Sequence, residues 1–213
     1  MARKTGSYAI STRTRVHQSA LRLFAQYGYA AVSMRQIAAE VGVQAGALYT
    51  YTPDKQALLF DLMRDHLAEL LAAWAAEPRP DGAMARLEGF VRFHIRHHFD
   101  RPEAVFVAYM ELRNLTPENY AKIQRLRRQY EDALVDILMD GQAEGCLDMP
   151  DTRIAAMAMI AMLTGVNTWY REDGRLSREE IGQIYWDMVQ RSLSVTDAYP
   201  AVQQTGVGRS APG

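Results

Sequence analysis

The chain has 213 residues, of which 48% are hydrophobic and 23% are charged, and its formal net charge is −1. This length allows one large domain or two small ones, and the composition is typical of a soluble globular protein rather than a disordered or fibrous one. The longest apolar run, residues 154–163, is about half as long as a bilayer span. The sequence has no charged start followed by an apolar stretch, so we expect no signal peptide. The single cysteine, Cys146, favours a reducing cytoplasm.

The charge is distributed unevenly along the chain. Residues 1–55 hold seven Lys or Arg and two Asp or Glu, a net charge of +5, whereas residues 56–213 hold seventeen and twenty-three, a net charge of −6. Phosphate neutralisation supplies most non-specific affinity for DNA, so a basic end on a nearly neutral protein favours a DNA contact surface. The alternative is that these basic residues are simply exposed to solvent and bind no DNA.

The first ten residues are polar, and we expect them to be disordered until a partner binds. Arg3, Lys4 and Arg13 are candidates for an arm that follows the minor groove or the DNA backbone, with a disordered tail as the alternative. Apolar periodicity then predicts a helix from residue 11 or 12 to residue 27, which Gly28 ends.

Residues 33–51 have the pattern of a helix-turn-helix. Ser33 and Gln36 have the spacing of a capping box at the start of a first helix. Gly42 stands where the chain has to turn sharply, and Leu48 supplies the inner face of a second short helix. The outer face of the second helix would present these residues to a major groove: Gln44, Ala45, Gly46, Tyr49 and Thr50.

The rest of the chain predicts helices alone, so the fold class is all-α. Pro53 and Asp54 are expected to open a long amphipathic helix that runs to about residue 76. The stretch Glu77–Gly82 is a clear helix breaker and a candidate domain boundary. Five more helices are expected at roughly residues 83–99, 102–114, 117–144, 152–171 and 177–194.

We divide the chain into three parts. Residues 1–55 are expected to form a three-helix helix-turn-helix DNA-binding domain, and residues 56–195 a helical domain that binds an effector and dimerises. Residues 196–213 are rich in Gly, Pro, Ser and Gln, and we expect a disordered tail there.

The N-terminal residues carry a resemblance to a known family. The segment ALRLFAQYGYAAVSMRQIAAEVGVQAGALYTYTPDKQALL contains a cluster of Phe24, Gly28 and Tyr29 and an I-A-x-x-x-G-V core. A helix over Gly46–Tyr49 and Lys55 at the next helix start complete the pattern. In this order and spacing, these features resemble the TetR/AcrR family of bacterial transcriptional regulators.

The resemblance implies an N-terminal domain that binds DNA and a C-terminal domain that dimerises around an effector cavity. Two departures concern the DNA side: many members carry Lys where this chain has Ala45, and many have a second aromatic or His pair followed by Phe at residues 50–52. The motifs at residues 111–117 and 165–181 resemble members that sense acyl-CoA thioesters or related degradation intermediates.

The predicted DNA contacts combine base reading with phosphate binding. Gln44 can reach a base edge bidentately, adenine being its best partner, and Thr50 can contact a thymine methyl. The resemblance implies phosphate contacts from Ser33 and Lys55, and Gly46 would let the backbone approach the DNA. Exposed polar surface residues are the alternative reading. The predicted set is Ser33, Arg35, Gln44, Ala45, Gly46, Tyr49, Thr50 and Lys55.

The resemblance also implies an effector cavity between the helices of the second domain. Its expected apolar lining is Phe90, Phe93, Phe106, Tyr109 and Met110, with Arg113 as a polar handle. An ordinary packed core would use the same residue types. If a CoA is bound, its phosphates need basic partners, and Arg125, Arg127 and Arg128 form the nearest cluster, although such a run is more often a solvated face.

Three histidines share one helix face, because His94, His97 and His98 stand at positions i, i+3 and i+4. Two such histidines with Glu103 could bind zinc in an all-helical enzyme. No nucleophile–base pair or phosphate-cradling loop accompanies them. We therefore expect no catalytic residue, no metal site and no cofactor.

The helix that begins at Ile154 is apolar nearly all round, so it has to be buried on more than one side. The resemblance implies a four-helix bundle made with the last helix and their copies in a C₂ dimer. The expected interface residues are Met159, Met162, Trp169, Tyr185 and Trp186. Cys146 is expected to be a bystander thiol rather than a redox sensor.

The sequence thus predicts a cytoplasmic, ligand-responsive regulator. It would act as a repressor, binding a pseudo-palindromic double-stranded DNA operator as a homodimer, without a membrane partner. A small lipophilic or acyl-CoA-like effector would release the operator. The alternatives are an all-helical metal-dependent enzyme and a DNA-binding dimer that has no effector.

Overall fold

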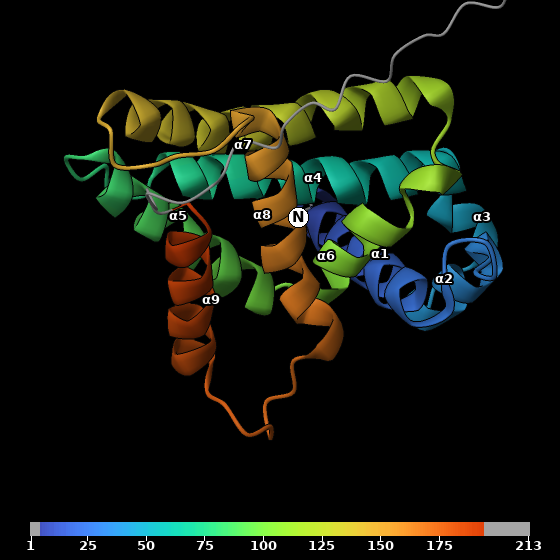
Figure 1. Cartoon of the computed structure of the whole chain (residues 1–213). Coiled ribbons are helices and arrows are strands. Elements are labelled where there is room, and N and C mark those ends of the chain that lie inside the picture. Colours follow the sequence, from blue (N-terminus) through green and yellow to red (C-terminus); the bar gives the residue numbers. More distant parts are fainter. Residues whose placement is uncertain (1–4, 194–213) are drawn as a thin grey trace, which may run out of the picture.

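The computed structural model describes residues 5–193, with side chains from residue 12 onward. In this part of the chain it has nine α-helices, one 3₁₀ helix and no strand, which confirms the all-α prediction (Figure 1). The elements are α1 (Thr5–Tyr27), α2 (Met34–Val41), α3 (Ala45–Leu48), α4 (Lys55–Ala75), α5 (Ala83–Phe99), α6 (Pro102–Met110), η1 (Leu112–Asn114), α7 (Pro117–Ala143), α8 (Thr152–Trp169) and α9 (Arg178–Ser192).

The start of the first helix differs from the prediction. α1 begins at Thr5 rather than near residue 11, so the expectation that the first ten residues are disordered is wrong for residues 5–10. These residues contain no proline, and the helix extends through them. Arg3 and Lys4 of the predicted arm, and the predicted tail, lie outside the described residues.

The helix expected over residues 102–114 is divided in the structure. α6 ends at Met110, Glu111 takes a backbone conformation of φ −100° and ψ 6°, and η1 follows. The side chain of Glu111 turns inward and accepts a hydrogen bond from the backbone of Tyr29, which lies after α1. This tertiary contact ends the helix at a point where the sequence has no breaker.

The first three helices pack around one apolar core. Gly28 ends α1 as predicted: its φ is +81°, and its N–H donates to the carbonyl of Phe24 at 2.9 Å. The fully or nearly buried residues of this core are Val16, Ala20, Phe24, Ile37, Ala38, Val41 and Leu48. The core holds α2 and α3 on the end of α1, with their other faces exposed.

α4 joins the two halves of the molecule. Asp54 caps it, because its carboxylate accepts the Ala57 N–H at 2.7 Å. The helix packs against α1 on one side and against α6 and α7 on the other. The domain boundary predicted at residue 55 therefore coincides with the start of a helix shared by both halves, and the division stays a prediction.

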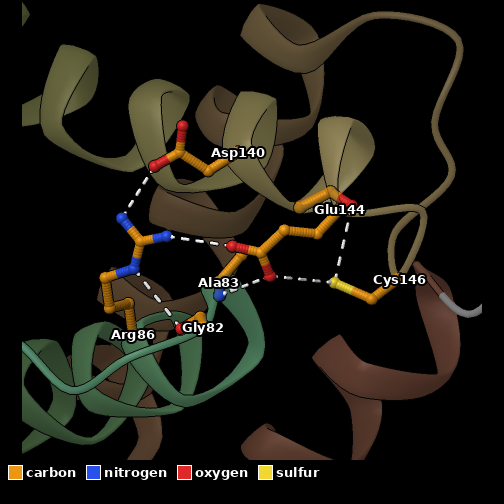
Figure 2. Close-up of polar contacts among 7 residues, drawn as sticks. Gly82, Ala83, Arg86, Asp140, Glu144 and Cys146 are labelled. Atoms are coloured by element: carbon orange, nitrogen blue, oxygen red, sulfur yellow. Dashed lines mark hydrogen bonds and ion pairs between the residues drawn. The ribbon is translucent and has the colours of Figure 1, made fainter.

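The Pro-rich break between α4 and α5 is fastened to the end of α7 (Figure 2). The Arg86 guanidinium donates to Asp140 at 2.7 Å and to Glu144 at 3.4 Å. Glu144 also accepts the Ala83 N–H at 2.8 Å, and the Cys146 Sγ lies 3.9 Å from the same carboxylate. The last residue of the break and the first turn of α5 are thus attached to the end of α7.

The C-terminal half is built around α5, which packs against α7, α8 and α9. In Figure 1, α8 and α9 run across the direction of α4 and α7. α6 lies against α1, α4 and α8, so it contacts both halves of the molecule. No helix in the described part is long and apolar enough to cross a membrane.

Candidate functional site

The helix-turn-helix predicted at residues 33–51 is formed as a capped pair of helices. Ser33 Oγ accepts the Gln36 N–H at 3.3 Å, and Gln36 Oε1 accepts the Ser33 N–H at 2.7 Å, which is the predicted capping box. Gly42 ends α2 with φ +75°, and its N–H bonds to the last carbonyls of the helix. The following residue, Val43, donates to the Ala38 carbonyl at 2.9 Å. These contacts fix the angle between α2 and α3.

α3 is short and is held by one apolar anchor. Leu48 is fully buried, while Tyr49 beside it is 54% exposed. The helical turn continues beyond α3, because the Tyr51 N–H donates to the Leu48 carbonyl at 2.9 Å. Thr52, a position where the chain departs from the family pattern, is buried and donates its hydroxyl to the Asp54 carbonyl at 3.1 Å.

Six of the eight predicted DNA contacts are exposed. These six are Ser33, Arg35, Gln44, Gly46, Tyr49 and Thr50. Ala45 is half-buried and packs against the core, and its DNA contact stays a prediction. Gly46 has no heavy atom of another residue near the position of a Cβ, so its surface is open.

The eighth predicted contact, Lys55, holds the loop that precedes the motif. Its ammonium donates to the carbonyls of Tyr29 and Val32, both at 2.8 Å, and lies 4.2 Å from the centroid of the Tyr29 ring. Burial lowers the pKa of Lys55, and the nearby Glu111 carboxylate opposes that shift. Two of the three N–H donors serve the fold, and a phosphate contact by the third stays a prediction.

The same loop is bound to the C-terminal half through buried polar contacts that the sequence did not predict. Glu111 accepts the Tyr29 N–H at 3.1 Å, and the Asn114 side chain donates to the same carboxylate. Gln56 donates to the Tyr29 hydroxyl at 3.1 Å and to the Asn114 carbonyl. The sequence places Glu111 and Asn114 in a motif that resembles acyl-CoA-sensing members, but nothing local indicates that Glu111 bonds to Tyr29, 82 residues away, or that Asn114 bonds to Gln56, 58 residues away.

Basic side chains of α1 also support the motif. Arg15 donates to the Val41 carbonyl at the end of α2, and Arg22 pairs with Glu40 at 3.2 Å. Arg13 lies 3.9 Å from Asp61 on α4. Part of the positive charge of residues 1–55 is thus used to attach α1 to its neighbours.

A cavity of about 380 Å³ lies between α1, α6 and α8. Three of the six predicted effector residues, Phe106, Tyr109 and Met110, are part of its lining. The sequence analysis did not predict the polar lining residues of α8, because the apolar pattern of this helix indicated packing rather than a binding site. The complete lining is Ala25, Pro102, Glu103, Val105, Phe106, Tyr109, Met110, Thr164, Asn167 and Thr168.

The other three predicted effector residues lie elsewhere. Phe90 and Phe93 are buried in a separate aromatic cluster, with ring centroids 5.0 and 5.4 Å from that of Trp74. Arg113 is exposed on η1 and does not line the cavity. The helix periodicity placed Phe90 and Phe93 on an inner face correctly, but it could not distinguish core from cavity wall.

The three α5 histidines are buried, and their contacts differ from those of a metal site. His94 Nδ1 is 3.2 Å from the Tyr130 hydroxyl, and His94 Nε2 is 3.1 Å from Thr164 Oγ1. The His98 ring stacks on that of His94 with centroids 3.8 Å apart. Burial lowers the pKa of His94 to about 3. No group of three His, Cys, Asp or Glu in the described part is placed to hold a metal ion.

The candidate phosphate cluster on α7 does not line the cavity. Arg125 and Arg128 are exposed. The Arg127 guanidinium lies over the Tyr109 ring, 4.4 Å from its centroid. A role of these arginines toward CoA phosphates therefore has no geometric support in this structure.

The predicted dimer residues divide into buried and accessible ones. Met159 and Trp186 are buried within the chain, so their side chains offer little surface to a second copy. Met162 and Tyr185 are half-buried, and Trp169 is 49% exposed. Other large apolar side chains exposed on α8 and α9 are Ile154, Met157, Ile184 and Met188.

Two protein-family descriptions match the chain. One, "Bacterial regulatory proteins, tetR family", matches residues 18–62, which contain α2 and α3. The other, "Tetracyclin repressor-like, C-terminal domain", matches residues 80–193, more than half of the chain.

Individual proteins are similar over nearly the whole length. The HTH-type transcriptional repressor KstR2 of Mycolicibacterium smegmatis is 27% identical over 198 residues, covering 89% of this chain and 94% of the relative. A solved tetR-family regulatory protein from Rhodococcus aligns with a TM-score of 0.82 and 28% identity, covering 87% and 98%. AibR, solved with isovaleryl coenzyme A and operator DNA, aligns with a TM-score of 0.76 and 24% identity, covering 83% and 97%.

Proposed function

The chain belongs to the TetR family of bacterial regulatory proteins, and we propose that it is a repressor that releases its operator when a small molecule binds. It acts in the cytoplasm as a homodimer on a pseudo-palindromic double-stranded operator. The effector is a small lipophilic or acyl-CoA-like compound. The protein carries out no chemical step.

The observation that carries the proposal is the exposed face of the capped helix pair. Gln44, Gly46 and Tyr49 are exposed, while Leu48 is buried and anchors α3 to the core. A helix presented in this way can enter a major groove, and Gln44 can read a base edge. Arg35 is exposed nearby and supplies positive charge toward the phosphates.

The exposed apolar face of α8 and α9 supports dimerisation. Trp169, Ile184 and Met188 are each between 44% and 49% exposed, which is unusual for a cluster of large apolar side chains on a monomer. A C₂ axis at this face would pair α8 and α9 with their copies. The two α3 helices would then read half-sites about 34–36 Å apart.

The cavity between α1, α6 and α8 is the proposed effector site. Its wall α6 ends at Met110, and the next residue, Glu111, bonds to the loop before the motif, so a ligand that shifts α6 would shift the motif. A preference of about 1–3 kcal/mol for one arrangement would change operator affinity several- to a hundredfold. AibR, which has this fold, was solved with isovaleryl coenzyme A, and this supports an acyl-CoA-like effector. A larger pocket of about 470 Å³ at the Pro78–Gly82 loop is less suitable, because charged residues such as Arg79 and Asp136 line it.

An electrophoretic mobility shift with the DNA upstream of the protein's own gene tests the proposal. We expect a specific shift that survives an excess of scrambled DNA. Tyr49→Ala should weaken it, whereas Tyr120→Ala, which alters a tyrosine of similar exposure on α7, should not. Absence of any specific shift at low salt would contradict the proposal.

Whether the protein responds to an effector is measured separately. Isovaleryl-CoA and other acyl-CoAs should raise the melting temperature, because a ligand that binds only the folded state stabilises it. They should also weaken the operator shift. A panel that changes neither quantity would favour a DNA-binding dimer without an effector.

A further inference from the structure

A row of polar groups leads from the protein interior to the proposed effector cavity. Tyr109 and Thr164 line the cavity. Thr164 Oγ1 is 3.3 Å from the Tyr109 hydroxyl and 3.1 Å from His94 Nε2. Behind His94, the Tyr130 hydroxyl is 3.2 Å from Nδ1. These four side chains come from α5, α6, α7 and α8, so the row is a product of the tertiary fold.

The donor and acceptor of each hydrogen bond in this row follow from its buried end, the Tyr130 hydroxyl. Tyr130 is 3% exposed, and His94 Nδ1 is the one hydrogen-bond partner of its hydroxyl among the described residues. A buried O–H without an acceptor is costly, so Tyr130 donates to Nδ1. Burial lowers the pKa of His94 to about 3, and the ring is neutral at pH 7 with its single N–H on Nε2.

The remaining steps follow from this tautomer. His94 Nε2–H donates to Thr164 Oγ1, which leaves the Thr164 hydrogen to be donated to the Tyr109 oxygen. The Tyr109 hydrogen then has no acceptor in the described part of the chain. Successive donors in one direction polarise one another, so the row strengthens Tyr109 as a donor toward the cavity.

The rest of the cavity restricts what can accept this hydrogen bond. Phe106 and Met110 make much of the lining apolar. Among the described residues no Lys or Arg belongs to the lining, and Glu103 adds negative charge. The Arg127 guanidinium lies against the ring face of Tyr109 and is not among the lining residues, so a neutral acceptor on an apolar body suits this lining better than a free carboxylate.

We propose that the effector carries a carbonyl group, as a thioester or a ketone, whose oxygen accepts a hydrogen bond from the Tyr109 hydroxyl. This inference rests on the proposed function, because it assigns the effector to the same cavity. Tyr109 is then the specificity-determining contact, and His94 and Thr164 are positioning residues that orient its donor.

Matched ligands that differ only at the carbonyl test the inference. Isovaleryl-CoA and its thioether analogue, 3-methylbutyl-CoA, are titrated calorimetrically into the full chain, and 2-octanone serves as a probe without CoA. The thioester should bind about tenfold more tightly than the thioether, since the thioether leaves the Tyr109 donor without a partner. Tyr109→Phe should remove this preference, whereas Tyr120→Phe, a matched change on the exposed side of α7, should keep it.

Infrared spectroscopy of carbonyl-labelled 2-octanone gives a readout that needs no variant. Bound to the native protein, its carbonyl stretch should lie below its frequency in hexane, as a hydrogen-bonded carbonyl does. A hexane-like frequency, equal affinity for thioester and thioether, or no binding of any carbonyl probe would overturn the inference. Binding of 2-octanone that depends on Tyr109, without binding of acyl-CoAs, would uphold it and contradict the acyl-CoA part of the proposed function. Operator binding is measured independently of all these outcomes.

Discussion

Glu111 is a carboxylate enclosed between the two halves of the molecule. It is 6% exposed, accepts the Tyr29 N–H and the Asn114 amide, and lies close enough to Lys55 to affect its pKa. A buried carboxylate is stable only when hydrogen bonds and a nearby cation replace its hydration. Its partners provide both, so Glu111 joins α6 to the loop that precedes the DNA-binding motif.

Glu111→Ala should lower the free energy of unfolding by about 1–3 kcal/mol, because the Tyr29 amide loses its acceptor. Urea unfolding measures this change. Glu118→Ala, which removes an exposed partner of Lys122 on α7, is the matched control and should leave the stability unchanged. Equal stability of the two variants would show that the Glu111 contacts contribute nothing net.

Lys55 illustrates which part of the site the sequence could predict. Its place at the start of α4 and its resemblance to a family pattern were visible in the sequence, and they predict a phosphate contact. The structure places its ammonium on two backbone carbonyls of the preceding loop. Such acceptors carry no side-chain signature, so no sequence pattern could have indicated them.

The helix-turn-helix contains two glycines with different roles, Gly42 in the turn and Gly46 in α3. Gly42 has φ +75°, a conformation that L side chains rarely adopt. Gly46 lies in α3 with open space around it, and its backbone is helical. One glycine is required by the fold, and the other is required only if DNA approaches closely.

Alanine at each glycine should separate folding from DNA binding. Gly42→Ala should lower the free energy of unfolding by about 1–3 kcal/mol, because alanine is strained at positive φ. Gly46→Ala should not destabilise the protein, since alanine favours helix, yet it should weaken operator binding. Chemical unfolding and fluorescence anisotropy measure the two effects. Operator affinity unchanged by Gly46→Ala would remove Gly46 from the DNA-contact set.

Several histidines are buried in their neutral form, because His66 of α4 lies against His97 and His98 of α5 and His94 is enclosed by α7 and α8. Burial lowers the pKa of His66 to about 4 and that of His94 to about 3, and it holds the pKa of His98 well below 6.5. Below pH 6.5 the unfolded chain binds protons that the folded chain does not. The free energy of unfolding therefore falls as the pH drops.

Urea unfolding at pH 7 and at pH 5 should show this loss. Each fully buried neutral histidine contributes up to about 1.4 kcal/mol per pH unit in the range between its folded and unfolded pKa values. His66→Leu removes one of these groups, and it should reduce the difference between the two pH values. Identical stability at pH 5 and pH 7 would contradict the burial of neutral imidazoles.

At the scale of the whole molecule, helices and their ends were largely predictable from the sequence. Caps and turns such as Ser33 with Gln36, and Gly42, depend on neighbours within a few residues, and the structure forms them as predicted. The break at Glu111, the cavity and the division of apolar residues between core and wall depend on distant parts of the chain. The sequence predicts both Phe90 and Phe106 as lining of the effector cavity, yet Phe90 is buried in the core and only Phe106 lines the cavity.

The apolar face of α8 and α9 should form the dimer interface. Ile184→Glu would bury a charge without a partner there, so it should shift the protein toward monomers in sedimentation velocity at micromolar concentration. Met139→Glu, which changes an exposed methionine of α7, should remain dimeric. A fully dimeric Ile184→Glu variant would place the interface on another face.

A DNase I footprint on the DNA upstream of the protein's own gene shows whether the protein reads its operator as a dimer. We expect two protected half-sites related by an imperfect dyad, with centres one helical turn or a multiple of it apart. Addition of the effector should remove both protections together, since the two readers belong to one dimer. A single unpaired site, or no protection at protein concentrations that saturate non-specific DNA, would contradict this expectation.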